Sequence, residues 1–139
     1  MTGHCAYGAV SVTITNKPAF INDCNCSLCR KVGAAWGYFP SSDVSAKGHT
    51  SCFSRSDKGE PAVAVHSCAA CGTTTHFGLT DSFKDRHPEA DQMGVNMRLF
   101  DPERLADVEV RYPDGRAWSG EGDYAFRSEP KIIGQTTFW

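Results

Sequence analysis

Three cysteines within six residues, Cys24, Cys26 and Cys29, constrain this chain more than any other feature of it. Zinc binds thiolates tetrahedrally at about 2.3 Å, and short spacings let one turn of backbone present several sulfurs to one point. In an extended segment Cys24 and Cys26 share a face, with Cα atoms roughly 6.6 Å apart. A turn after Cys26 then brings Cys29 to the same centre. The spacing therefore predicts a zinc site with three ligands from one loop.

Such a site has a fourth position, and its occupant decides the chemistry. If water or substrate takes that position, the zinc is of the catalytic type. If one of the five histidines takes it, the site is closed and purely structural. The cations that follow, Arg30 and Lys31, favour ionised thiols in either case. On spacing alone both alternatives stay open.

A second cysteine cluster follows at Cys68 and Cys71, directly before Gly72. The chain has seven cysteines, an odd number that cannot be fully paired in disulfides. Nothing in the sequence indicates the oxidising compartment that disulfides need. Metal ligation explains both clusters, and Gly72 suits the positive φ of a cysteine knuckle.

Length and charge narrow the class of protein further. With 139 residues the chain is expected to form one domain. A net charge of -2 and a pI near 6.2 predict no nucleic-acid partner and no binding to an anionic membrane surface. The N-terminus lacks a secretory signal, and no segment approaches the roughly 18 apolar residues of a membrane span. We therefore expect a cytoplasmic protein.

Short alternating segments predict an all-β fold. Strand candidates lie at residues 9–15, 35–39, 49–53, 62–66, 73–79, 95–99 and 108–112. Two of them, 62–66 and 73–79, are expected to form a hairpin with the Cys68 and Cys71 cluster at its tip. Helical periodicity is almost absent, which favours a single domain of antiparallel β-sheets with little helix. Residues 1–125 are expected to form this domain, and residues 126–139 a tail that packs on the domain or on a partner. The apolar residues of that tail leave a homo-oligomer open.

The remaining segments are expected to be connections. The three-cysteine loop links two strands, residues 41–47 form a polar bridge, and residues 80–92 form a loop or a short irregular helix. Asp101, Pro102 and Glu103 predict the start of a single helical turn. Cys52 has no partner at a metal-ligand spacing and is expected to be a small buried hydrophobe.

Four motifs occur in order along the chain, namely Gly3-x-Cys5-x-x-Gly8-Ala9-Val10, Cys24-x-Cys26-x-x-Cys29-Arg30, Cys68-x-x-Cys71-Gly72 and the segment from Val95 to Leu105. Together they resemble the glutathione-dependent formaldehyde-activating enzyme family, which also includes centromere protein V. The match covers roughly residues 3 to 118, and several ordered motifs arise by chance far less often than one.

The resemblance implies a zinc-containing tent of antiparallel β-sheets. It also implies a catalytic zinc at Cys24, Cys26 and Cys29, and a structural zinc whose ligands include Cys5, Cys68 and Cys71. In the family a further cysteine stands where this chain has Tyr7. A neutral phenol with a pKa near 10 replaces a thiolate poorly. We therefore expect a three-thiolate structural site whose fourth ligand is His4, His66, water or none.

The activity implied by the resemblance is that of a carbon-sulfur lyase. It joins a thiol, glutathione, to a small aldehyde, formaldehyde, and gives S-hydroxymethylglutathione, a step of formaldehyde detoxification. The alternative is a non-catalytic, zinc-stabilised β domain that binds a protein or another small molecule.

Residues around the three cysteines carry weaker signals. Asn25, Ser27 and Arg30 are either donors of hydrogen bonds that hold the thiolates or solvated loop residues. Trp36, Tyr38 and Phe39 follow the loop and are candidates to line a substrate pocket. At least two of these aromatic residues are expected in the core, because alternate strand residues face opposite sides.

Overall fold

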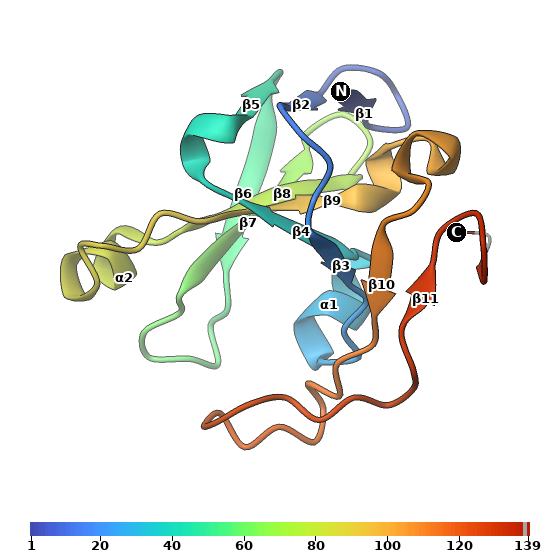
Figure 1. The fold of residues 1–139 in the computed structure, drawn as a ribbon. Helices are drawn as coiled ribbons and strands as arrows, with labels where there is room; N and C mark the ends of the chain where they lie inside the picture. Colours follow the sequence, from blue (N-terminus) through green and yellow to red (C-terminus); the bar gives the residue numbers. More distant parts are fainter. Residues whose placement is uncertain (138) are drawn as a thin grey trace.

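Two β-sheets make up most of the fold (Figure 1). The computed structural model describes residues 1–137 and 139. The strands are β1 Thr2–His4, β2 Ser11–Ile14, β3 Phe20–Asn22, β4 Trp36–Phe39, β5 Val44–Lys47, β6 Thr50–Ser54, β7 Val63–Cys68, β8 Thr74–Leu79, β9 Met93–Asn96, β10 Glu109–Arg111 and β11 Lys131–Ile132. One sheet has the order β1-β2-β5, and the other has the order β11-β10-β3-β4-β9-β8-β7-β6.

Most neighbouring strands run antiparallel. The pair formed by β3 and β10 is parallel, with Ile21 opposite Val110. Helix is scarce: the structure has α1 Ser27–Val32, α2 Asp81–Arg86 and single 3-10 turns at Ser41–Asp43, Met97–Leu99 and Pro102–Leu105. The predicted fold class, an all-β domain with little helix, is confirmed.

Each predicted strand lies where the alternation placed it, with shifts at the ends. In β2, Val12 and Ile14 are fully buried while Thr13 is exposed. The hairpin of β7 and β8 carries Cys68 at the end of its first strand, and Gly72 in its tip has a φ of 73°. Asp101 caps the turn Pro102–Leu105 by accepting a hydrogen bond from the Glu103 amide.

Two connections and the end of one strand differ from the sequence-based expectation. The three-cysteine loop contains α1, which begins after Cys26 and ends at Val32; Gly33, with a φ of 64°, caps its C-terminus. The polar bridge is a 3-10 turn followed by β5, which pairs with β2 through its backbone. The strand expected at 95–99 ends at Asn96, because the Asn96 side chain accepts a hydrogen bond from the Arg98 amide and starts a 3-10 turn.

The expected burial of Cys52 is wrong. Cys52 lies on β6, the edge strand of the larger sheet, and is exposed. Four of the five residues of this strand are exposed, because no further layer covers it in the described chain.

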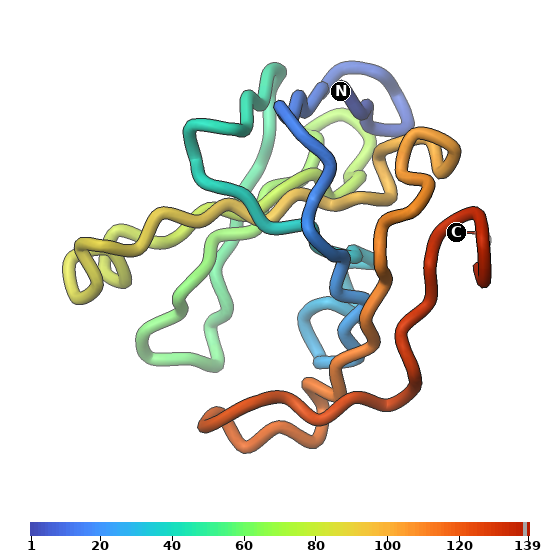
Figure 2. The backbone as a smooth tube through the Cα atoms, viewed as in Figure 1, coloured from blue at the N-terminus to red at the C-terminus, as the bar shows by residue number. Residues whose placement is uncertain are grey.

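The main core lies between the sheets and contains Ile14, Ile21, Val95, Met97 and Val110, all fully buried. The C-terminal segment returns to this core. After a loop that runs past α1, the C-terminal segment comes back beside β10 (Figure 2). There β11 pairs with β10, and Ile133 is buried against the main cluster. None of the helices in residues 1–137 is long and apolar enough to span a membrane.

Candidate metal centres

Cys24, Cys26 and Cys29, here called the central trio, converge at one point. Their three sulfur atoms lie within 4.8 Å of one another. The end of β3 positions Cys24, since the amide of Asp23 donates to the carbonyl of Arg111 across the parallel pair at 2.9 Å. Cys26 caps α1 and Cys29 lies in its first turn. The helix replaces the simple turn that the spacing predicted, and it brings the same three thiols together.

Each sulfur of the central trio accepts one N–H hydrogen bond. The amide of Cys26 donates to Cys24 Sγ and the amide of Cys29 donates to Cys26 Sγ, both at 3.4 Å. The third donor is the indole Nε1 of Trp36, 3.3 Å from Cys29 Sγ. Trp36 is buried and meets the ring of Phe77 edge-on with centroids 5.0 Å apart, which fixes the indole.

The three thiols cannot all ionise without a cation. The pKa of the Cys26 thiol is lowered to about 2, because the thiols of Cys24 and Cys29 and nearby backbone amides stabilise its anion. The same neighbours, with burial, raise the pKa of Cys29. The opposite directions of these two pKa shifts show that ionisation of one thiol opposes ionisation of its neighbours. A metal ion removes this conflict, because it stabilises all three thiolates.

The geometry of the central trio fits zinc. Tetrahedral zinc with ligands at about 2.3 Å places sulfurs roughly 3.8 Å apart, a spacing that these side chains reach with little movement. The main chain of Gly115 packs against the trio. A Cβ on Gly115 would lie 2.5 Å from Cys24 Sγ and 3.0 Å from Cys26 Cβ, so a side chain there would intrude on the sulfurs.

Asn25 holds this glycine turn in place. Its Nδ2 donates to Asp114 Oδ1 at 2.7 Å, and its Oδ1 accepts from the Arg116 amide at 2.9 Å. Asn25 therefore supports the site through the 113–117 turn and not by a direct bond to sulfur. Ser27 makes no side-chain hydrogen bond within the described chain.

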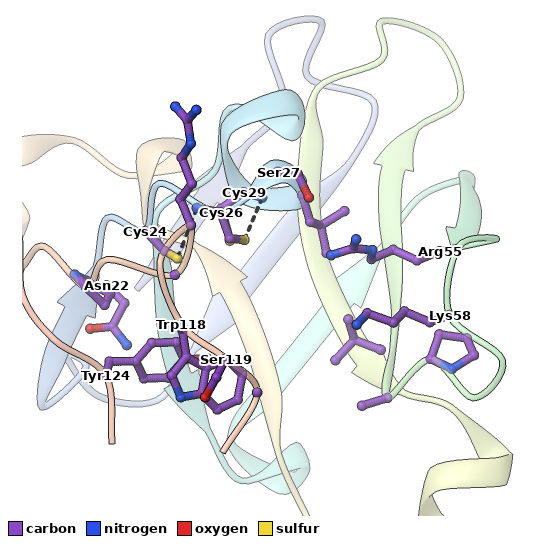
Figure 3. A pocket seen from close by; sticks show the side chains of 18 of the residues that line it. Asn22, Cys24, Cys26, Ser27, Cys29, Arg55, Lys58, Trp118, Ser119 and Tyr124 are labelled. Carbon is purple, nitrogen blue, oxygen red and sulfur yellow. Dashed lines mark hydrogen bonds between the residues drawn. The ribbon is translucent and has the colours of Figure 1, made fainter. Parts of the chain in front are cut away.

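A cavity of about 630 Å³ opens beside the central trio. Figure 3 shows Arg55 and Lys58 on one side of it and Trp118, Ser119 and Tyr124 on the other, with the thiols at one end. The rings of Trp118 and Tyr124 lie 4.5 Å apart. Arg55 donates to Asp57 at 2.8 Å, so part of its charge is compensated. None of these wall residues carries a recognisable motif, which is why the sequence did not indicate them.

Of the three aromatic residues after the loop, only Tyr38 lines this cavity, while Trp36 and Phe39 are buried. The expectation that at least two belong to the core is confirmed. Asn22 Nδ2 donates to Tyr38 Oη at 3.3 Å. Burial, as the largest cause, raises the pKa of Tyr38 to about 12, so its hydroxyl keeps a proton available for donation.

Cys5, Cys68 and Cys71, here called the second trio, also lie with their sulfurs within 4.8 Å of one another. Cys5 and Cys68 are buried and Cys71 is exposed. The Val10 amide donates to Cys5 Sγ at 3.3 Å, and Thr73 Oγ1 lies 3.1 Å from Cys71 Sγ. The second trio lines neither this cavity nor the smaller groove described below.

The second trio gains no fourth ligand from its described neighbours. Tyr7 is 74% exposed, and no imidazole joins the three sulfurs among the residues described. His4 is exposed. His66 has its Nδ1 3.1 Å from Thr50 Oγ1 and stacks on His76 with centroids 4.4 Å apart. Of the alternatives left open by the sequence, His66 is engaged by Thr50 and His76, and His4 is exposed and does not join the three sulfurs.

Comparison with known proteins assigns the chain to a family. The family model described as glutathione-dependent formaldehyde-activating enzyme matches residues 1–111. A crystal structure of a Rhodobacter sphaeroides protein shares the fold with a TM-score of 0.57 and 24% sequence identity, over 78% of this chain and 97% of that one. No curated protein matches the sequence. With the family model covering most of its length, the chain belongs to the glutathione-dependent formaldehyde-activating enzyme family.

Proposed function

We propose that this protein catalyses the addition of a thiol to a small aldehyde, with glutathione and formaldehyde as substrates and S-hydroxymethylglutathione as product. The observation that carries the proposal is the convergence of three thiols at the end of a cavity large enough for both substrates. Membership of the family supports the same reaction class.

In this proposal Cys24, Cys26 and Cys29 hold zinc. Bound there, zinc would supply a position at which a substrate thiol is held as the thiolate. Three thiolate ligands leave zinc a weak Lewis acid, which favours thiol binding over polarisation of the aldehyde. Trp36 and the amides of Cys26 and Cys29 orient the ligand sulfurs through the hydrogen bonds described above.

The reaction breaks the S–H bond, forms a C–S bond and converts the carbonyl oxygen to a hydroxyl, with no net oxidation or reduction. The oxygen of the aldehyde therefore needs a proton as the C–S bond forms. Tyr38 lines the cavity, and its Oη carries a proton at neutral pH, as any phenol with a pKa of 10 or above does. We assign Tyr38 as the donor of that proton, and the proton released by the substrate thiol returns to Tyr38 through solvent, so that no net proton is gained or lost.

The proposal also covers the residues that bind the substrate and the cellular compartment of the protein. Lys58 and Arg116 in the cavity wall complement an anionic thiol such as glutathione. Seven unpaired cysteines suit a reducing cytoplasm, where glutathione is the abundant thiol.

The test is exchange spectroscopy of the glutathione–formaldehyde equilibrium with and without the zinc-loaded protein. The proposal expects faster exchange with protein and loss of the acceleration in Cys26→Ser. Cys52→Ser is the matched control, because Cys52 is exposed and outside both trios. If the protein does not accelerate exchange, a non-catalytic zinc-stabilised β domain is left as the function.

A further inference from the structure

A second, smaller hollow lies against the central trio. It has a volume of about 440 Å³, and its lining includes Arg30, Arg98 and Arg127; it is called the arginine groove. Cys24 and Cys29 line both this groove and the larger cavity. A ligand in the arginine groove therefore lies next to the same thiols as a ligand in the cavity.

The three arginines come from distant parts of the chain. Arg30 lies on α1, Arg98 lies in the 3-10 turn after β9, and Arg127 lies on the segment that leads to β11. The Arg127 amide donates to the carbonyl of Tyr112 at 2.9 Å, which ties that segment beside the groove.

Two of these guanidinium groups are already fixed. Arg98 Nη2 donates to Asp23 Oδ2 at 3.0 Å, and Arg98 lies 5.1 Å from the Trp139 ring centre. Arg127 Nη2 donates to the carbonyl of Asp23 at 2.7 Å, and Arg127 lies 5.1 Å from the Tyr112 ring centre. Fixed guanidinium groups lose little entropy when a ligand binds.

Hydrogen-bond donors are in excess in the groove. Asp23 is the only carboxylate among the described residues that line it, so three guanidinium groups face one carboxylate. Arg30 makes no side-chain hydrogen bond or ion pair within the described chain. Each guanidinium has five N–H donors in a planar fork, a geometry that matches a carboxylate.

We propose that the arginine groove binds a carboxylate of the thiol substrate while the thiol of that substrate meets the central trio. This inference rests on the proposed function for the identity of the substrate. The larger cavity has a different character, since it holds aromatic rings and its Arg55 is paired with Asp57. Its Lys58 and Arg116 are left to complement the second carboxylate of glutathione.

Binding of S-methylglutathione to the zinc-loaded protein tests the proposal, because this thioether keeps both carboxylates and cannot condense with an aldehyde. Arg30→Gln is expected to weaken binding about tenfold at low salt. The diethyl ester of the same ligand, which lacks both carboxylates, is expected to bind wild type and Arg30→Gln equally weakly.

Lys31→Gln is the matched control. It removes the same charge from the same helix end, and Lys31 lines neither the groove nor the cavity. Retained affinity in Lys31→Gln shows that the effect belongs to the groove and not to net charge. Unfolding curves for both variants check that they fold.

Three results would overturn the proposal: unchanged affinity in Arg30→Gln, an equal loss in Lys31→Gln, or a loss confined to Arg55→Gln. Binding of inorganic phosphate that depends on Arg30, without binding of S-methylglutathione, would also overturn it by assigning the groove to another anion. Because the ligand does not react, absence of catalysis in the exchange experiment leaves this result unaffected.

Discussion

Among single residues, Trp36 makes the one side-chain N–H contact to the central trio found in residues 1–137 and 139. Trp36→Phe keeps an aromatic ring in the core but removes the donor to Cys29. We expect zinc affinity to fall about tenfold. In the cobalt-substituted protein the sulfur-to-metal charge-transfer band should move to longer wavelength, because the Cys29 thiolate becomes more electron-rich. Trp118→Phe makes the same change away from sulfur and should alter neither quantity; an unshifted band in Trp36→Phe would contradict the assignment.

His76 gives a prediction about pH. Its pKa is lowered to about 4, first by burial and then by the neighbouring His66. The unfolded chain, with a histidine pKa of about 6.5, takes up this proton first as pH falls. The contribution of His76 to the free energy of unfolding is therefore complete above about pH 6.5, and it is lost as the pH falls toward the pKa of His76 in the folded protein.

We expect the wild type to lose about 1 kcal/mol more stability than His76→Gln between about pH 7 and pH 5. Denaturant titrations at the two pH values measure this difference, and subtraction of one protein from the other removes the common effect of acid on the metal ligands. Equal losses in the two proteins would show that His76 does not titrate in this way.

The sequence predicts the metal-ligating cysteines far better than it predicts the residues that contact them, such as Trp36 and Arg127. The cysteines of the central trio were predicted to meet because ligand spacing is a local property of the chain. The Trp36 contact depends on which face of β4 the indole occupies and on its packing against Phe77, which comes from β8. Arg127 reaches Asp23 only through the return of the C-terminal segment. No local pattern records either contact.

At the scale of elements, α1 and the 113–117 turn enclose the central trio from two sides, and Asn25 joins them. Asn25→Ala removes both hydrogen bonds and should cost roughly 1–3 kcal/mol of local stability. We expect faster hydrogen exchange in residues 113–117 and faster transfer of zinc to a chelator. Ser27→Ala, in the same loop, is the control and should change neither rate. Equal exchange in the two variants would show that the Asn25 hydrogen bonds do not hold the 113–117 turn in place.

The strands were predicted correctly where apolar and polar residues alternate strongly. The alternation of β2 and the hairpin of β7 and β8 sufficed for their assignment. α1 was missed because it has six residues, buries none of them and is capped by the thiol of Cys26 instead of a hydroxyl or carboxylate. β5 was missed because its residues lack alternation and its place depends on pairing with β2.

For the whole molecule, the second trio acts as a link between the two sheets. Cys5 follows β1 of the smaller sheet, and Cys68 and Cys71 lie at the tip of the β7–β8 hairpin of the larger one. The contacts beside it are few: a small buried cluster of Cys5, Val10 and Cys68, and a hydrogen bond of 3.3 Å from the Ala6 amide to Thr73 Oγ1. We expect metal at the second trio to strengthen, at this end of the sheets, the attachment that the main core between them already provides.

Cys5→Ser should therefore lower the free energy of unfolding by on the order of 3 kcal/mol. Faster hydrogen exchange should appear first in β1 and β2, which belong to the smaller sheet. The metal content should fall to about one zinc per chain, held by the central trio.

Cys26→Ser should give the reverse pattern, because the Cys26 sulfur lies only in the central trio. Hydrogen exchange should stay slow in β1 and β2 and become faster around the cavity. Wild type should bind between one and two zinc ions per chain, since the second trio offers three protein thiolates and no imidazole in the described chain. Two tightly held ions, both with complete protein coordination, would contradict this account. Equal exchange in β1 and β2 for both variants would show that the hydrophobic core alone holds the sheets together.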